Sequence, residues 1–490
     1  MVDTKLFVVV LCCCAAATVV ATPLDDYVNM ADPHYKYEVL SEHKVHGEYI
    51  AYVLNMTSQK WLTYNDSDSA IWWHYLTITI PDELTHPEYA AIYVTGGSNH
   101  DGPPDPLKDA ETLFTSLMAV GSGCVSAILR QIPNQPIVFK TDPLQKRRSE
   151  DAIIAFTWRH FIENGTDEPY WLLRMPMTKA VVRAMDTITD HVLKVRGEKV
   201  SKFVIAGASK RGWTTWTTGA VDKRVVGIAP MVLDLLNMVK NLHHMYRSLG
   251  GWTFAFEDYY TENVTLYLDD PNTQKMADIV DPLAYKDRLT MPKLIITAGS
   301  DEFFLPDDSY YYFDLIPEPK FLRITPNGEH SLTLHHVELV TVMTAFMRTI
   351  TEPTDWTQPK MTWKRYENST HGIIELISDP PPFRIEVWRT LTNRGKRRDF
   401  RLAVAKTEGS SEIYPHLIIY KNFPARNPSR GKYIAEFLTP ETGWQCFFIK
   451  AFYYAPGGAI ISFTTEANIT PSQKFAVPDC HGTECRGTLV

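Results

Sequence analysis

Runs of apolar and β-branched residues alternate with amphipathic segments over the first 350 residues. Eight runs have the length and composition of strands: 49–54, 71–80, 90–95, 125–129, 203–206, 225–230, 292–299 and 320–324. Helical periodicity appears at 110–120, 176–195 and 332–350, most clearly where Met177, Val181, Met185, Ile188 and Val192 follow one another at three- and four-residue steps. Strands that alternate with helices predict an α/β fold, a parallel sheet with helices packed on its faces.

The pattern changes twice along the chain. Residues 236–289 are rich in aromatic side chains and show no clean alternation, which predicts a helical cap inserted over the sheet's carboxyl edge. Residues 351–359 contain two prolines and no periodicity, and therefore read as a linker. Beyond it, short β-type runs follow at 384–388, 401–404, 416–420, 447–454 and 459–464. We expect a first domain over 22–352 and a β-sandwich-like domain over 353–490.

The first 21 residues have the pattern of a secretory signal. Lys5 precedes an apolar run from Leu6 to Val20, and small residues lead to a predicted cleavage site after Ala21. The alternative is an uncleaved anchor, for which the run is short. No later segment is apolar enough to cross a bilayer, so the sequence predicts a secreted, extracellular protein with no membrane insertion after cleavage.

Glycosylation and disulfide patterns agree with secretion. Six Asn-x-Ser/Thr sequons lack proline at the middle position, at Asn55, Asn65, Asn164, Asn263, Asn368 and Asn468. Four cysteines lie outside the signal: Cys124, Cys446, Cys480 and Cys485. They are disulfide candidates with three connectivities, and in one of these Cys480 pairs with Cys485 and Cys124 with Cys446. A zinc site is the weaker interpretation, because no second ligand pair with finger-like spacing is present.

Composition narrows the classes of function. With 490 residues, of which 44% are hydrophobic, the chain can bury a large core and form at least two domains. The net charge of −8 argues against nucleic acid as a partner, because phosphate binding needs a basic surface. The metalloprotease, phosphate-loop and dinucleotide motifs are all missing from the sequence, so we expect neither a metal nor an organic cofactor.

The stretch 203–216 holds the candidate nucleophile. An apolar strand runs to Ala206, the chain turns at Gly207, and Ser209 lies on the bend before Gly212 and a helical segment. A strand, a tight turn and a helix lift a serine hydroxyl out of the sheet edge, where the helix N-terminus favours negative charge. The alternative is a serine in an ordinary strand-to-helix turn.

An acid and a histidine follow two later strands. Asp301 comes directly after the strand 292–299 and its Ser300, and His330 follows the strand 320–324. Strands of an open α/β sheet assemble their sites at the carboxyl ends, and the chain order Ser, Asp, His is that of α/β-hydrolases. Glu302 is the alternative acid, but Asp301 lies closer to the strand end. We therefore expect Ser209 as nucleophile, His330 as base and Asp301 as its orienting acid.

When a serine attacks a carbonyl group, negative charge develops on the substrate oxygen. Two hydrogen-bond donors directed at this oxygen stabilise the charge. We expect the backbone N–H of Lys210 to be one, and that of Gly97 or Ser98, in the loop after strand 90–95, to be the other. For the side chains of Lys210 and Arg211 two interpretations stay open. They either extend into solvent or pair with acidic residues, or one of them binds an acidic group of the substrate or supports the oxyanion.

Several longer stretches resemble the PhoPQ-activated pathogenicity-related family, which includes secreted autocrine proliferation repressors. These stretches are 56–61, 128–136, 176–180, 207–213, 301–307 and 398–401, and the resemblance spans nearly the whole mature chain. It implies an α/β-hydrolase domain of the esterase or peptidase type, followed by a β-rich C-terminal domain.

Two functions are compatible with these patterns. The first is a secreted serine hydrolase acting on a small ester, peptide or glycan substrate. The second is a secreted signalling protein that uses the hydrolase fold as a ligand for a cell-surface receptor, without requiring catalysis.

Overall fold

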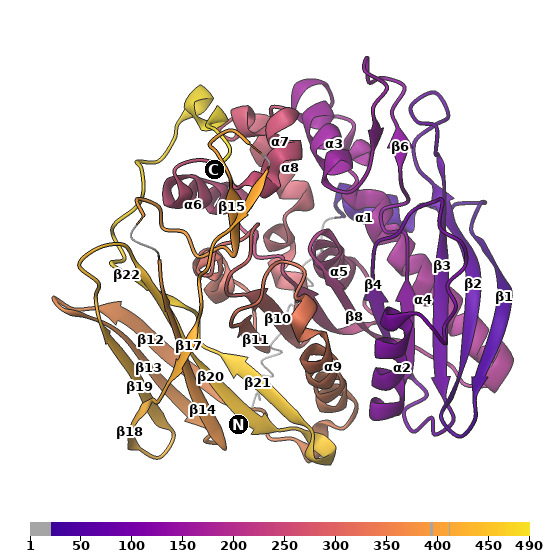
Figure 1. The fold of residues 1–490 in the computed structure, drawn as a ribbon. Helices are drawn as coiled ribbons and strands as arrows, with labels where there is room; N and C mark the ends of the chain where they lie inside the picture. Colours follow the sequence, from indigo (N-terminus) through magenta and orange to yellow (C-terminus); the bar gives the residue numbers. More distant parts are fainter. Residues whose placement is uncertain (1–20, 393–394, 411) are drawn as a thin grey trace, which may run out of the picture.

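A nine-stranded sheet forms the centre of the protein in this computed structural model, which describes residues 21–392, 395–410 and 412–490 (Figure 1). The strands lie in the order β1-β2-β3-β5-β4-β8-β9-β10-β11. Their bounds are β1 Lys36–Val45, β2 Tyr49–Lys60, β3 Ile71–Pro81, β4 Tyr89–Val94, β5 Val125–Leu129, β8 Lys202–Ala208, β9 Val225–Met231, β10 Lys293–Ala298 and β11 Lys320–Thr325. The eight strands predicted between residues 49 and 324 are confirmed, and β1 is a further strand that the pattern did not predict.

Strand direction identifies the fold. The pairs β1-β2, β2-β3 and β3-β5 are antiparallel, whereas every pair from β5 through β4, β8, β9 and β10 to β11 is parallel. Two core clusters cover the two faces, one including residues of α3, α4 and α5 and the other residues of α2 and α9. This arrangement is the predicted α/β-hydrolase fold.

The helices have the following bounds: α1 Pro23–Asn29, α2 Ala110–Ser122, α3 Asp151–Asn164, α4 Arg174–Arg196, α5 Lys210–Val221, α6 Met238–Leu249, α7 Glu257–Thr261, α8 Pro271–Val280 and α9 His336–Thr351. Residues 236–289, the predicted cap, contain α6, α7, α8 and the 3-10 turns η2 (Phe254–Phe256), η3 (Val264–Tyr267) and η4 (Pro282–Arg288). In Figure 1, α6, α7 and α8 lie on the same side of the molecule as the C-terminus. No helix in the described ranges combines the length and apolarity that a membrane span requires.

The C-terminal region contains two larger antiparallel sheets, as the β-sandwich-like prediction requires, and the two-stranded antiparallel sheet β15 (Ala403–Ala405) and β16 (Ile413–Pro415). One has the order β12-β13-β19-β18, and the other contains β17, β14, β20, β21 and β22. Their bounds are β12 Lys360–Glu367, β13 His371–Asp379, β14 Arg384–Leu391, β17 Lys421–Phe423, β18 Arg426–Ser429, β19 Lys432–Leu438, β20 Gln445–Tyr454, β21 Ile460–Thr464 and β22 Asn468–Thr470. A core that includes Ile374, Val387, Ala435 and Ile449 joins the two sheets.

The predicted strand at 416–420 is wrong. The segment is irregular, and its apolar side chains Ile418 and Tyr420 are buried in the large core. The Tyr420 hydroxyl donates to the carbonyl of Gly299 at 2.8 Å, and its backbone N–H donates to the Asn327 side chain at 2.7 Å. Apolar residues here are explained by packing against the loops after β10 and β11, which produces the same composition as a strand.

Two of the four predicted disulfide cysteines are paired and two are free. Cys480 and Cys485 form a disulfide, whereas Cys124 and Cys446 are free and buried, so the predicted candidate pair Cys124 and Cys446 is not formed.

The predicted glycosylation sites differ in exposure. Asn65, Asn164 and Asn368 are exposed and Asn55 and Asn263 are half-buried. Asn468 is buried and donates to two backbone carbonyls, so the prediction of a surface glycan there is wrong for the folded protein. The predicted signal, residues 1–21, lies outside the described residues except for Ala21.

Candidate active site

The turn between β8 and α5 places Ser209 in an unusual backbone conformation. Ser209 has φ 57° and ψ −127°, a combination that costs energy for a residue with a side chain. Glycines make the turn feasible: a Cβ on Gly207 would lie 2.8 Å from the carbonyl oxygen of Arg211, and one on Gly212 would lie 2.7 Å from that of Met231. The serine hydroxyl is thus held at the carboxyl edge of the sheet by local geometry that only small neighbours permit.

A chain of hydrogen bonds joins three side chains at this edge. The Ser209 Oγ lies 2.9 Å from Nε2 of His330, and Nδ1 of His330 lies 2.8 Å from Oδ1 of Asp301. Asp301 follows β10 and His330 follows β11, so two neighbouring parallel strands deliver them to the same place. The residues that the sequence predicted as nucleophile, base and acid therefore lie together in the order that serine activation requires.

Asp301 and Glu302 occupy different positions around the histidine. Asp301 is buried, and its Oδ1 also accepts the backbone N–H of Phe303 at 2.7 Å. Glu302 instead accepts the backbone N–H of His330 at 2.9 Å, and burial raises the pKa of its carboxyl. The aspartate thus faces the imidazole, whereas the glutamate fixes the loop that carries it.

Aromatic side chains surround the hydroxyl. The rings of Phe303 and His330 have centroids 4.3 Å apart, and those of Phe304 and His330 are 5.8 Å apart. Ser209 opens onto a cavity of about 30 Å³. Most of its walls are apolar, and its lining is Asp151, Ile154, Trp158, Ser209, Lys210, Trp213, Leu233, Leu235, Leu242, Phe256, Tyr259, Phe303 and Phe304.

The glycine loop after β4 behaves only in part as predicted. The Ser98 N–H donates to the carboxylate of Asp101 at 2.6 Å, so Ser98 is engaged within its own loop and the prediction that it is a free donor is wrong. Gly97 has φ 131°, a conformation that favours glycine. Its N–H has no acceptor among the described residues, which leaves Gly97 as the candidate partner of the Lys210 N–H.

The loop is braced by residues that sequence analysis did not single out. Gln131 donates its backbone N–H to the Gly96 carbonyl at 2.7 Å and its amide to the Ser98 carbonyl at 3.3 Å. Buried His74, on β3, lies 3.2 Å from the Gln131 carbonyl through Nδ1 and 2.8 Å from the Ser58 hydroxyl through Nε2. No local pattern could have revealed this support, because the residues come from separate strands.

Lys210 and Arg211 pair with acidic residues. Lys210, which is buried, places Nζ 2.8 Å from Glu150 and 2.9 Å from Asp151, and Arg211 lies 2.5 Å from Glu150. Burial would raise the pKa of Glu150, but the two cations hold it at about 2. Of the two interpretations that the sequence left open, ion pairing is the one present in the structure.

The Lys210→Met variant should therefore lose stability without changing preference for charged substrates. When Nζ is removed, Asp151 keeps its hydrogen bond from the Tyr259 hydroxyl at 2.8 Å and Glu150 keeps its ion pair with Arg211. We therefore expect the free energy of unfolding to fall by about 1–2 kcal/mol, which is less than the loss on breaking a fully buried ion pair. Urea unfolding measures this loss, with exposed Lys223→Met as control. A selective loss of turnover on acidic esters, relative to neutral ones, would contradict the structural role.

The β-rich region contacts the loop that carries the acid. Arg398, which is buried, donates to both carboxylate oxygens of Asp307, one of them at 3.0 Å, and its backbone N–H donates to the Ser248 carbonyl. Burial opposes ionisation of Asp307, but Arg398 and then His244 hold its pKa well below the usual range. The backbone N–H of Leu402 donates to the carbonyl of Ser300 at 3.1 Å, directly before Asp301. These contacts from the β-rich region fix the loop that carries the acid.

Comparisons with known proteins agree on the family. The model of the PhoPQ-activated pathogenicity-related protein family matches residues 24–401. Autocrine proliferation repressor protein A of Dictyostelium discoideum is 38% identical over 467 residues, which cover 93% of this chain and 91% of that protein.

Solved structures with a related arrangement are distant in sequence. An acetyl xylan esterase from Paenibacillus sp. R4 aligns with a TM-score of 0.45 and 13% identity, over 66% of this chain and 92% of that one. A glucuronoyl esterase from Solibacter usitatus aligns with a TM-score of 0.39 and 13% identity, over 66% and 90%. The family match and the 38% identity confirm the resemblance seen in the sequence, and the chain belongs to the PhoPQ-activated pathogenicity-related protein family.

Proposed function

We propose that this protein is a secreted serine hydrolase that cleaves a small ester or peptide bond through an acyl-enzyme. The observation that carries the proposal is the continuous hydrogen-bonded chain from Ser209 through His330 to Asp301. His330 takes the hydroxyl proton as Ser209 attacks the carbonyl, and Asp301 orients the imidazole and stabilises its cationic form. The same histidine then returns the proton to the leaving group, and water repeats the sequence to release the acid.

The oxyanion is held by backbone donors. The N–H of Lys210 lies at the N-terminus of α5, where the helix dipole favours negative charge, and the N–H of Gly97 supplies the second donor. The side chains of Lys210 and Arg211 take no part in binding charge on the substrate, since Glu150 and Asp151 already neutralise them. We therefore favour a neutral substrate group next to the scissile carbonyl.

Labelling with a fluorophosphonate probe tests the proposal. Such a probe reacts with a serine that its base and oxyanion donors have activated. The native protein should be labelled at Ser209, as peptide mapping can verify, whereas Ser209→Ala and heat-denatured protein should not. Absence of labelling in correctly folded protein would refute the hydrolase function.

A second candidate function rests on the relative's name. That protein is called an autocrine proliferation repressor, and 93% of this chain aligns with it. In this alternative the chain is a secreted signal that binds a cell-surface receptor, and the hydrolase fold supplies only the surface. A proliferation assay with native protein and Ser209→Ala separates the two: equal activity of both would favour signalling without catalysis.

A further inference from the structure

One wall of the Ser209 cavity comes from the helical segment above the sheet. Phe256, at the end of η2, and Tyr259, in α7, line the cavity together with residues of α3, α5 and α6 and of the loops after β9 and β10. The space they leave is small, about 30 Å³. The position of this wall therefore decides how large a group can sit beside the serine.

The wall belongs to a row of aromatic rings. Phe256 stacks on Trp252 at 6.1 Å between centroids with planes 5° apart, and it contacts Phe303 at 6.1 Å. Phe303 in turn lies on His330 at 4.3 Å. A displacement of Trp252 would thus be passed to the cavity through one side chain, because stacked buried rings move together.

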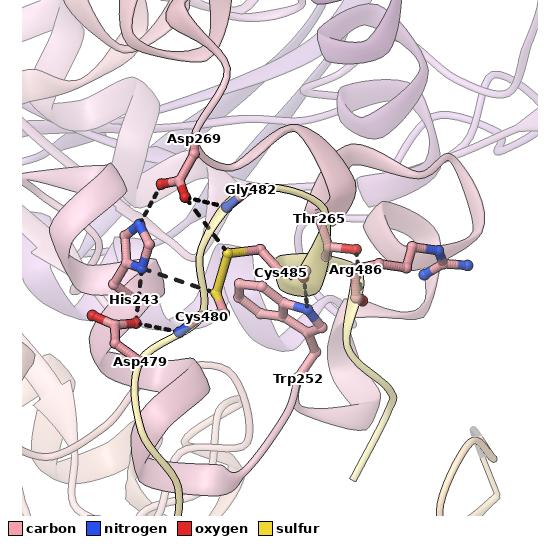
Figure 2. The surroundings of a disulfide bond; sticks show 9 residues. All are labelled: His243, Trp252, Thr265, Asp269, Asp479, Cys480, Gly482, Cys485 and Arg486. Carbon is pink, nitrogen blue, oxygen red and sulfur yellow. Dashed lines mark hydrogen bonds and ion pairs between the residues drawn. A yellow bond between two sulfur atoms is a disulfide. The ribbon is translucent and has the colours of Figure 1, made fainter.

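Three hydrogen bonds tie Trp252 to the C-terminal tail, and Figure 2 shows the one to Cys485. Its indole N–H donates to the Cys485 carbonyl at 2.9 Å and its backbone N–H to the Thr488 carbonyl at 2.8 Å. Its own carbonyl accepts the N–H of Val490 at 2.8 Å. Trp252 is fully buried, so these bonds satisfy its polar groups and help to set its position, together with the ring contacts to Tyr246 and Phe256.

The tail is itself anchored by a loop that the disulfide closes. Cys480 and Cys485 are joined, and within the loop the Gly482 N–H donates to Asp269 at 2.6 Å. His243 lies between Asp269, at 2.9 Å, and Asp479, at 2.8 Å, and so connects α6 to both segments (Figure 2). Just beyond the loop, the guanidinium of Arg486 lies 3.4 Å from the ring centre of Tyr260 in α7.

We propose that the disulfide-closed loop, residues 480–485, is a specificity element of the Ser209 site. It positions Trp252, which holds the Phe256 wall and keeps the cavity small enough to admit only short acyl groups such as acetyl. The proposal rests on the hydrolase function proposed above. Opening the loop, by a dithiol that gives two electrons and two protons to the disulfide and leaves two thiols, should let the wall recede and longer acyl chains enter.

The test compares p-nitrophenyl acetate, butyrate and octanoate with the native protein and the double variant Cys480→Ser/Cys485→Ser. After subtraction of the Ser209→Ala background, kcat/KM of the native protein should favour acetate over octanoate by about 100-fold or more, because groups that exceed a closed pocket are rejected steeply. In the double variant this ratio should fall by about tenfold. A native preference for octanoate, or the same ratio in a folded double variant, would overturn the proposal.

Controls separate the loop from other thiols and from general damage. A dithiol should lower the acetate-to-octanoate ratio of the native protein and leave that of the double variant unchanged. The variant Cys124→Ser, which lacks one of the two buried free thiols, should respond to the dithiol as the native protein does. If the double variant does not fold, Arg486→Ala decides the matter, since it loosens the tail while the disulfide stays. An unchanged ratio in that folded variant would overturn the proposal.

Hydrogen exchange gives a result that does not depend on catalysis. Amides of residues 252–261 should exchange at least about tenfold faster after reduction, because the bonds that hold Trp252 are loosened. Unchanged exchange would overturn the proposal even if every ester were cleaved. Conversely, faster exchange with no labelling of Ser209 would refute the hydrolase function and leave the structural role of the loop standing.

Discussion

Asp301→Asn should lower kcat by about 10⁴-fold while leaving the fold intact, by analogy with the loss of the orienting carboxylate in serine proteases. The amide presents a donor or a weaker acceptor to Nδ1 of His330, which lies 2.8 Å away, and so favours the tautomer that cannot take the Ser209 proton. Steady-state turnover of an ester that the native protein cleaves measures the effect, and circular dichroism verifies the fold.

Glu302→Gln is the matched control. The neighbouring carboxylate accepts the backbone N–H of His330, and an amide oxygen can accept the same bond. We expect a decrease in kcat of less than about tenfold, because one positioning hydrogen bond is weakened and not removed. Equal losses in the two variants would assign the orienting role to both acids, and a larger loss in Glu302→Gln would contradict the assignment of Asp301.

The second large effect concerns stability below neutral pH and comes from His74. This histidine is completely buried on β3, and burial lowers its pKa to about 4, against the bonds to the Arg130 and Gln131 carbonyls that would raise it. The unfolded chain takes up a proton near pH 6.5, whereas the folded protein does so only near pH 4. Stability from the neutral ring is therefore fully present above pH 6.5 and is lost as the pH falls to about 4, by about 3 kcal/mol.

Urea unfolding between pH 4 and 7 measures this dependence. His74→Gln should be less stable at pH 7, because it loses packing and the Ser58 contact, but its stability should fall less steeply on acidification. His46→Gln changes an exposed histidine in the turn after β1 and serves as control. A His74→Gln variant with the native pH dependence would show that other groups cause the acid instability.

Sequence patterns were sufficient for Ser209, Asp301 and His330 because each lies in the turn or loop that follows a strand of the central sheet. A buried parallel strand is a continuous apolar run, so it can be recognised from neighbouring residues alone. The residues that follow it then lie at the carboxyl edge of the sheet. Patterns failed where the burial of a residue depends on segments that are distant in the sequence. Tyr420 belongs to no strand and packs on Gly299, and Asn468, which carries a glycosylation motif, is buried beneath β12 and β13 through its bonds to Tyr366 and Ile373.

By itself the sequence determined the alternation of strands and helices in the first 350 residues, the turn at Ser209 and the candidates for acid and base, since these depend on neighbours within a few residues. Only the tertiary structure decided that Asp301 faces the imidazole, that Ser98 is engaged by Asp101, and that the charges of Lys210 and Arg211 are paired. It also brought the C-terminal loop into contact with Trp252, although Cys485 lies 233 residues after Trp252 in the chain. Such contacts join segments remote in sequence, and their geometry is set by how the whole core packs.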